Sequence, residues 1–209
     1  FRDFQSTPVP SALINEVLAD AQYAPSNCNT QPWTTHIVSG SKRDELSRAL
    51  HEANNAGHLT PDFSWDEMKF AGRLGERRRE HGKLYYENLG VMRDDVEARR
   101  LAGAINFSFF NAPHVALLFM PSIGDNVRVA GDIGMYGQTF LLSLAARGLG
   151  AVPQTVLGLY ADTVRNVLHV PADMKLLFGI SFGYPNLQAP ANQARIGRDP
   201  LSDSVKFHD

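Results

Sequence analysis

The chain has 209 residues, of which 44% are hydrophobic and 20% charged, a composition typical of one soluble globular domain. Its formal net charge is -2 and it has no long arginine or lysine cluster, which argues against a nucleic-acid partner. No apolar run is long enough to span a bilayer, no signal peptide is visible, and the single cysteine, Cys28, excludes an internal disulfide. We therefore expect a cytoplasmic protein that does not bind a membrane.

The first elements predicted are a helix, a turn and a strand. Apolar residues at helical spacing predict a helix over about 11–23. The turn that follows, residues 24–33, reads Ala-Pro-Ser-Asn-Cys-Asn-Thr-Gln-Pro-Trp. Its two prolines and its short amide and hydroxyl side chains predict a stiff segment that is rich in hydrogen-bond donors. Residues 34–39 then predict a strand, and 41–55 a helix capped by Ser41.

The middle of the chain begins with a highly charged segment. Residues 66–88 predict a helix with four arginines, which is either a solvated helix or part of a lid. Residues 95–110 predict a further helix with an aromatic end, terminated before Pro113. The nearly continuous apolar run 114–120 is typical of a strand that is buried on both faces.

The longest predicted helix spans about 126–147 and carries Gly131, Gly134 and Gly137 along one stripe, where small residues let another helix come close. Because these glycines lie within a helix and not in a strand-to-helix turn, we reject a dinucleotide-binding Rossmann motif. Residues 151–157 predict a short strand, 162–168 a helix beginning at an Asp162 cap, and 176–182 a final strand. This uneven alternation of helices and strands favours an α+β fold.

Several short motifs occur in an order that resembles the FMN-dependent nitroreductase family. They are Arg2-Asp3-Phe4, the Pro25-Ser26 turn up to Trp33, Asn111-Ala112-Pro113, Asp132-x-Gly134-x-x-x-Gln138, Val152-Pro153-Gln154 and Gly183-Tyr184-Pro185. The resemblance covers most of the chain. It implies one nitroreductase domain over 1–209, with a central, mostly antiparallel sheet flanked by helices. It also implies a helical lid over 58–92, and a homodimer in which the tail, 184–209, wraps the partner and exchanges a strand with it.

The resemblance also implies where FMN binds. Three arginines would hold the phosphate: Arg2, Arg195 and Arg198. Because the chain begins at Phe1 and not at a methionine, we expect further residues before it that complete the phosphate site. One subunit would contact the ring through Pro25, Ser26, Asn27, Asn29 and Gln31, and the other through Pro153, Gln154, Thr155 and Val156. The family often has an acidic residue and a glycine after this proline, so the donor to the flavin N5 stays open here. Tyr85 and Tyr86 of the lid are the candidate substrate contacts.

The chemistry predicted for this chain is that of its cofactor. No paired carboxylates, catalytic triad or metal-ligand spacing is found, so we expect no catalytic side chain and no metal, with the flavin N5 as reacting centre. NAD(P)H would donate hydride directly to the flavin and leave before the acceptor binds, which predicts ping-pong reduction of nitroaromatic or quinone-like acceptors. The alternatives are reductive dehalogenation, the flavin-destroying chemistry of related proteins, and a non-catalytic flavin-binding protein. The physiological acceptor and the preference between NADH and NADPH stay open.

Overall fold

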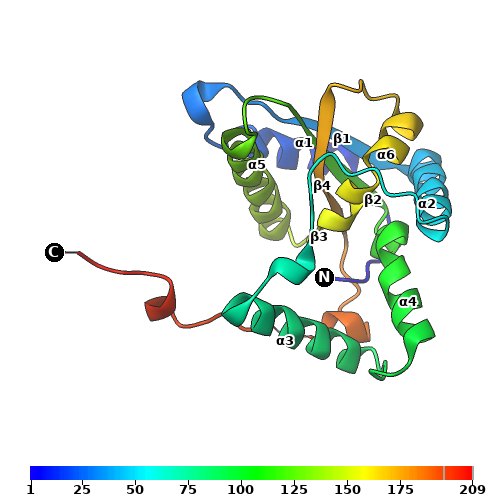
Figure 1. The fold of residues 1–209 in the computed structure, drawn as a ribbon. Helices are drawn as coiled ribbons and strands as arrows, with labels where there is room; N and C mark the ends of the chain where they lie inside the picture. The colour runs from blue at the N-terminus through cyan, green and yellow to red at the C-terminus, as the bar shows by residue number, and fades with distance from the viewer. Residues whose placement is uncertain (195, 209) are drawn as a thin grey trace.

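The computed structural model describes residues 1–194 and 196–208. At its centre is an antiparallel sheet with the strand order β1-β2-β4-β3 (Figure 1). The strands are β1 (Thr34–Ser39), β2 (His114–Pro121), β3 (Gly150–Gln154) and β4 (Met174–Gly183). The α-helices are α1 (Ser11–Ala21), α2 (Gly40–Asn55), α3 (Gly72–Asn88), α4 (Val96–Ala104), α5 (Val127–Ala146) and α6 (Ala161–Leu168). Short 3₁₀ helices are η1 (Asn27–Asn29), η2 (Glu67–Lys69), η3 (Ile105–Asn111), η4 (Thr155–Leu159), η5 (Pro190–Asn192) and η6 (Leu201–Asp203). The predicted α+β class and helix-flanked antiparallel sheet are confirmed.

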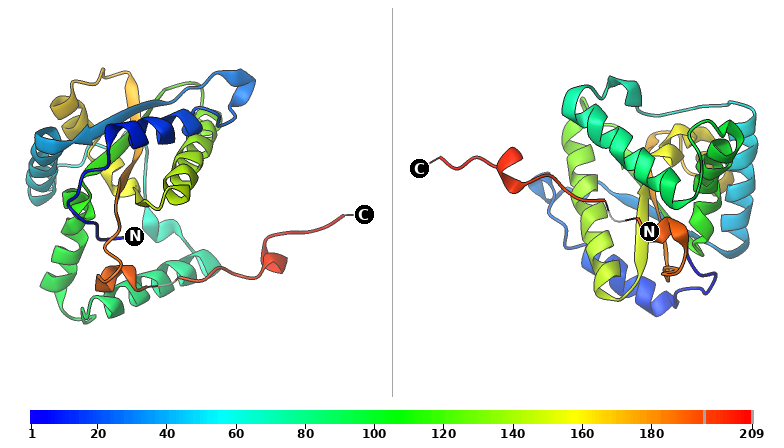
Figure 2. Two further views of the ribbon diagram at one scale, coloured as in Figure 1. Left: turned by 180° about the vertical axis from the view of Figure 1, so that it is seen from behind. Right: turned by 90° about the horizontal axis from the view of Figure 1, so that it is seen from below.

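Helices cover both faces of the sheet, with α1 and α5 on one face and α2 and α6 on the other (Figures 1 and 2). Strand β2 explains this arrangement. Leu117 and Phe119 enter the core beside α2 and α6, whereas Leu118 and Met120 enter the core beside α1 and α5. Successive side chains of a strand point to opposite faces, so a continuous apolar run requires apolar cover on both. The strand predicted to be buried on both faces is therefore confirmed.

The helix predicted over 95–110 is wrong at its end. α4 stops at Ala104, and the chain continues as η3, in which Phe109 and Phe110 have left-handed backbones with φ of 56° and 53°. Both rings are fully buried, and the Arg43 guanidinium donates to the carbonyl oxygens of Ser108 at 2.7 Å and Ala112 at 3.1 Å. Burial of the two rings and these bonds stabilise a sharp change of direction that helical periodicity does not reveal.

Three smaller predictions also differ from the structure. Asp162 does not cap α6, which begins at Ala161 with Tyr160 at the N-cap position, so Asp162 lies in its first turn. Ser41 does not cap α2: Ser39 occupies the N-cap position, and its hydroxyl instead pairs with His114 Nδ1 at 2.5 Å. β3 ends at Gln154, three residues before the predicted end, and η4 follows it. Gly158 in η4 lies so close to β4 that a Cβ there would be 2.9 Å from the Leu177 carbonyl oxygen, which only glycine permits.

The three glycines of the α5 stripe lie in two different environments. A Cβ on Gly137 would lie 3.0 Å from the ring of Phe178, so this glycine allows close packing on β4. Gly131 and Gly134 have open space where a Cβ would lie, and no helix of the described chain packs on them. The predicted close helix is therefore absent from the described part of the protomer. No helix within the described ranges is long and apolar enough to cross a bilayer.

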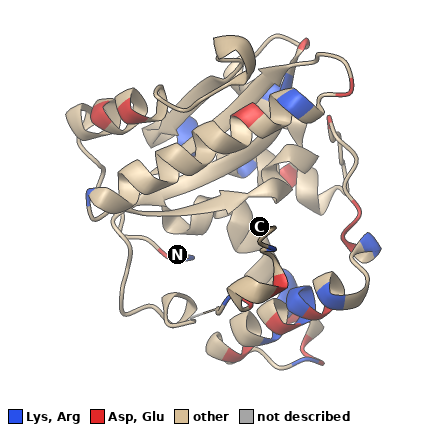
Figure 3. Cartoon of the chain, turned by 90° about the vertical axis from the view of Figure 1, so that its left-hand side faces the viewer, with Lys and Arg blue, Asp and Glu red and all other residues tan. Residues whose placement is uncertain are grey.

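The segment 58–92 forms an excursion whose main element, α3, lies apart from the sheet, and the tail after β4 first runs alongside it (Figures 1 and 2). Basic and acidic residues are interspersed along α3 (Figure 3). Asp199 of the tail pairs with Arg73 at 3.0 Å and also with Arg77. Beyond this point the tail extends away from the body, and its described residues form no strand. The lid and the exchanged strand stay predictions.

Candidate functional site

The turn between α1 and β1 is fastened at two points. The backbone N–H of Asn27 donates to both carboxylate oxygens of Asp132, at 3.1 and 3.2 Å. Asp132 lies on α5 and is buried. Ser26 Oγ accepts a hydrogen bond from the backbone N–H of Gln31 at 3.0 Å. The hydroxyl of Ser26 thus closes the turn, and Asp132 ties the turn to the long helix.

The same turn has an unusual backbone. Cys28, Asn29 and Gln31 have left-handed conformations, with φ of 51°, 55° and 47°. Residues other than glycine rarely adopt this backbone conformation, and asparagine is among those that adopt it most readily. Asn27, Asn29 and Gln31 are exposed, and Gln31 Nε2 donates to Asn29 Oδ1 at 3.2 Å. The turn therefore presents several amide groups to solvent in one defined conformation, which suits a planar ligand with polar edges.

Arg2 is a partly buried cation near the start of the chain. One of its guanidinium nitrogens donates to His81 Nε2 at 3.0 Å, and the group lies over the ring of Tyr85, 4.8 Å from its centroid. Burial lowers the pKa of Arg2, and burial together with the charge of Arg2 lowers the pKa of His81. Within the described ranges Arg2 forms no ion pair. Its charge is therefore available to an anionic ligand.

A network of amides fixes the backbone beside Arg2. The Arg2 backbone N–H donates to Asn192 Oδ1 at 2.6 Å, and Asn192 Nδ2 donates to the Asp3 carbonyl at 2.8 Å. The Asp3 carboxylate in turn accepts from Asn111 Nδ2 and Asn186 Nδ2, both at 2.7 Å. The start of the chain is thereby held against η3, at Asn111, and the segment after β4, at Asn186 and Asn192. Sequence reasoning missed this network because its members are far apart along the chain.

The role of the tail in the predicted phosphate site stays a prediction. Arg198 is exposed, and the hydrogen bonds described for its guanidinium go to the carbonyls of Ile196 at 3.1 Å and Gly197 at 3.0 Å. Arg195, the second tail candidate, lies outside the described residues. Of the two predicted phosphate residues that the structure describes, Arg2 is partly buried and Arg198 is exposed.

The end of β3 carries the other predicted ring contacts. The side chain of Gln154 is buried, donates to the Asn106 carbonyl at 2.9 Å and accepts from the Ser181 hydroxyl. These bonds occupy the side chain of Gln154, and the whole residue is only 3% exposed. Pro153 and Thr155 are exposed, and Val156 packs against the core beside α2. Of the four predicted residues, Pro153 and Thr155 have side chains accessible to a bound ring.

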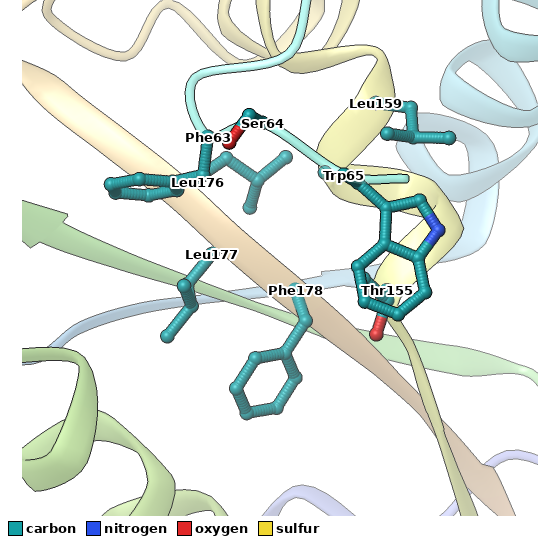
Figure 4. A pocket seen from close by; sticks show the side chains of 9 residues that line it. Phe63, Ser64, Trp65, Thr155, Leu159, Leu176, Leu177 and Phe178 are labelled. Carbon is teal, nitrogen blue, oxygen red and sulfur yellow. The ribbon is translucent and has the colours of Figure 1, made fainter. Parts of the chain in front are cut away.

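Thr155 also borders a pocket of about 360 Å³ that the sequence did not reveal (Figure 4). The loop before α3 contributes Phe63, Ser64 and Trp65, and β4 contributes Leu176, Leu177 and Phe178. None of the lining side chains is charged. The aromatic residues of the loop were visible in the sequence, but no pattern there indicated that they meet β4.

Tyr85 and Tyr86, the two predicted substrate contacts, each stack against an arginine in this protomer. Tyr85 packs under Arg2, and the ring of Tyr86 lies under Arg99, 4.0 Å from its guanidinium carbon. Burial raises the pKa of Tyr85. Neither tyrosine lines the pocket bordered by Thr155. Their contact with a substrate stays a prediction.

These groups fit the three parts of FMN. Arg2 can neutralise the phosphate, the amides of the turn can meet the polar edge of the ring, and the apolar pocket adjoins the segment predicted to approach N5. The turn precedes β1 and Thr155 follows β3, which are the two edge strands of the sheet. Three inter-strand spacings of about 4.8 Å separate these edges, about 14 Å in all. No metal-binding cluster of acidic, histidine or cysteine side chains is found in the described ranges.

Comparison with known proteins identifies the family. The model of the Nitroreductase family matches residues 1–184. "Nitroreductase NfnB" of Mycolicibacterium smegmatis is 43% identical over 99% of this chain and 87% of its own length. "4-nitrobenzoate reductase" of Pseudomonas putida is 32% identical over 99% of this chain and 90% of its own length. The crystal structure of the FMN-dependent nitroreductase NfnB from Mycobacterium smegmatis in complex with NADPH has a TM-score of 0.95 and 42% identity, covering 100% of this chain and 93% of that one. The chain therefore belongs to the nitroreductase family.

Proposed function

We propose that this protein is an FMN-dependent oxidoreductase that uses NAD(P)H to reduce nitroaromatic or quinone-like acceptors by a ping-pong mechanism. The observation that carries the proposal is the combination of a fixed, amide-rich turn with a partly buried arginine, Arg2, that forms no ion pair within the described ranges. The named relatives support the reaction class, since they are nitroreductases. One of them is FMN-dependent and has been crystallised with NADPH.

The side chains of this protein bind and orient, and no acid or base among them is required. When bound, FMN supplies the redox chemistry by accepting hydride from NAD(P)H and passing it to the acceptor. Arg2 would hold the phosphate, and the amides of Asn29 and Gln31 would donate to the polar edge of the ring, where negative charge grows on reduction. The uncharged pocket beside Thr155 receives the acceptor ring and excludes water from it.

The proposed enzyme is a homodimer with two flavins at its interface, in which the tail wraps the partner and the 58–92 excursion acts as the lid. One face of α5 supports this assembly. On it Val127, Met135 and Leu142 are 69%, 41% and 61% exposed, and Gly131 and Gly134, with open space around them, lie beside these side chains. Apolar side chains and glycines on one exposed helix face favour close packing against a second copy. Sedimentation velocity should give a dimer at micromolar concentration, and a monomer would contradict the assembly. We place the enzyme in the cytoplasm, which its one free cysteine, Cys28, and its use of NAD(P)H support.

Steady-state kinetics test the reaction. FMN-loaded protein is assayed with NADPH or NADH as donor and with nitrobenzene or a benzoquinone as acceptor. Double-reciprocal plots at several acceptor concentrations should give parallel lines, because the donor product leaves before the acceptor binds. Intersecting lines would contradict the ping-pong order. Protein that retains FMN but turns over neither donor would instead be a flavin-binding protein.

A further inference from the structure

The loop that leads to α3 is fastened to the body of the protein just before it reaches the pocket. The backbone N–H of Thr60 donates to the Leu159 carbonyl at 2.9 Å, and Thr60 Oγ1 accepts from the Asp162 backbone N–H at 3.1 Å. These bonds attach the loop to the end of η4 and to the start of α6. The next fastening point is Asp62, whose side chain turns into the protein.

Asp62 is a buried carboxylate, with its side chain 5% exposed, and it bonds to both α6 and β4. Its Oδ2 atom accepts from the Arg165 guanidinium of α6 at 2.6 Å and from the Leu176 backbone N–H of β4 at 2.8 Å. Lys175 Nζ lies 3.5 Å from Oδ1. Charge-assisted bonds of this kind, made to a carboxylate withdrawn from water, are strong and fix geometry.

The position of this carboxylate in the chain connects it to the pocket. The next three residues, Phe63, Ser64 and Trp65, form the loop wall of the pocket, and Leu176 belongs to its β4 wall. Asp62 therefore bonds directly to one wall and is covalently continuous with the other. Trp65 is 49% exposed, so its own packing holds it weakly. Asp62 is therefore placed to hold the loop wall against β4.

We propose that Asp62 is a positioning residue for the acceptor: through Arg165 and the Leu176 N–H it fixes residues 63–65 against β4, and so sets the width of the pocket in which the aromatic acceptor binds. The inference rests on the proposed function, because it concerns the acceptor step of that reaction. Asp62 itself does not line the pocket and contacts neither the turn nor Arg2. Its loss should therefore change acceptor binding and leave flavin binding unchanged.

Asp162 is a matched control on the same arginine. Its carboxylate pairs with Arg165 at 2.6 Å, the same distance as Asp62, but its side chain is 56% exposed and it belongs to α6. Asp162→Asn and Asp62→Asn each remove one carboxylate charge from Arg165. They differ in whether the carboxylate also holds the pocket wall. A general effect of weakening the Arg165 ion pairs would appear in both variants.

The experiment compares the FMN-loaded wild type, Asp62→Asn and Asp162→Asn with NADPH and nitrobenzene. Asp62→Asn should raise the KM for nitrobenzene at least about fivefold, since small misplacements of substrate contacts have large kinetic effects. The FMN content and the rate of flavin reduction by NADPH should stay within about twofold of the wild type, as should every parameter of Asp162→Asn. Equal effects of the two variants, or slower flavin reduction in Asp62→Asn, would overturn the proposal.

A double variant tests whether Asp62 acts through the loop wall. Trp65→Ala should itself raise the KM for nitrobenzene, and adding Asp62→Asn to it should then change the KM by less than about twofold, since both act on one wall. Effects that multiply would contradict the proposal. Arg165→Lys, which keeps the cation but cannot bridge both carboxylates, should raise the same KM and serves if Asp62→Asn does not fold. If the wild type reduces no flavin with either NADPH or NADH, the proposed function fails first, and this result is separate from the comparison of variants.

Discussion

Asp132→Ala isolates the contact that ties the candidate flavin turn to α5. The variant removes the carboxylate that accepts from the Asn27 backbone N–H at 3.1 and 3.2 Å. Asn27 is exposed, so its freed N–H can bond to water, and the stability of the fold should change little. The turn itself should relax, because Cys28, Asn29 and Gln31 are held in left-handed conformations that are unfavourable without support.

The magnitude follows from the kind of bond that is lost. A hydrogen bond to a charged acceptor contributes about 1.5–3 kcal/mol, and each 1.4 kcal/mol is about a factor of ten in an equilibrium constant. If FMN binds only the ordered turn, the apparent dissociation constant rises as the ordered fraction falls. We therefore expect the dissociation constant for FMN to increase by about 10- to 150-fold in Asp132→Ala. Asp132→Asn keeps one oxygen acceptor and should give a smaller increase.

The assay is a fluorescence titration of FMN with apoprotein. The control is Asp125→Ala, since Asp125 also accepts one backbone N–H, that of Val127 at 3.1 Å, but lies just before α5 and away from the turn. Asp125→Ala should bind FMN as the wild type does. Unchanged affinity in Asp132→Ala, or equal losses in both variants, would refute the role given to this carboxylate.

Three further results are expected. Arg2→Ala should raise the dissociation constant for FMN by about 10- to 150-fold in the same titration. The dissociation constant for riboflavin, which has no phosphate, should not change. Equal losses of affinity for both ligands would argue against the phosphate contact. The uncharged pocket lining should make kcat/KM for nitrobenzene at least about tenfold higher than for 4-nitrobenzoate, whose carboxylate would lose water without gaining a countercharge. Burial lowers the pKa of His36, His81 and His114, so the unfolded chain binds more protons, and the free energy of unfolding of the apoprotein should fall as the pH drops below about 6.5. Urea unfolding at pH 7.5 and 5.5 measures this fall, which should be smaller in His114→Gln; a stability that rises towards pH 5.5 would contradict it.

The sequence predicted the elements whose patterns are local. The apolar run of β2 indicated burial on both faces, and Leu117 and Leu118 do point into the two different cores. The prolines and amides of residues 24–33 indicated a fixed, donor-rich turn, which Ser26 and Asp132 hold in place.

The remaining features depend on contacts between distant residues. The left-handed backbone of Phe109 and Phe110 is stabilised by tertiary burial and by Arg43, so helical spacing could not predict where the helix ends. The pocket brings residues 63–65 against 155 and 176–178, and Asp62 meets Arg165 from 103 residues away. No local pattern encodes such pairings.

The absorption spectrum of the purified protein, recorded anaerobically, tests the central claim most directly. FMN is supplied, NADPH or NADH is added, and nitrobenzene or a benzoquinone follows. The account predicts that the flavin bands bleach with the nucleotide and return in full with the acceptor. Bands that never bleach, or a protein that binds no FMN, would contradict it.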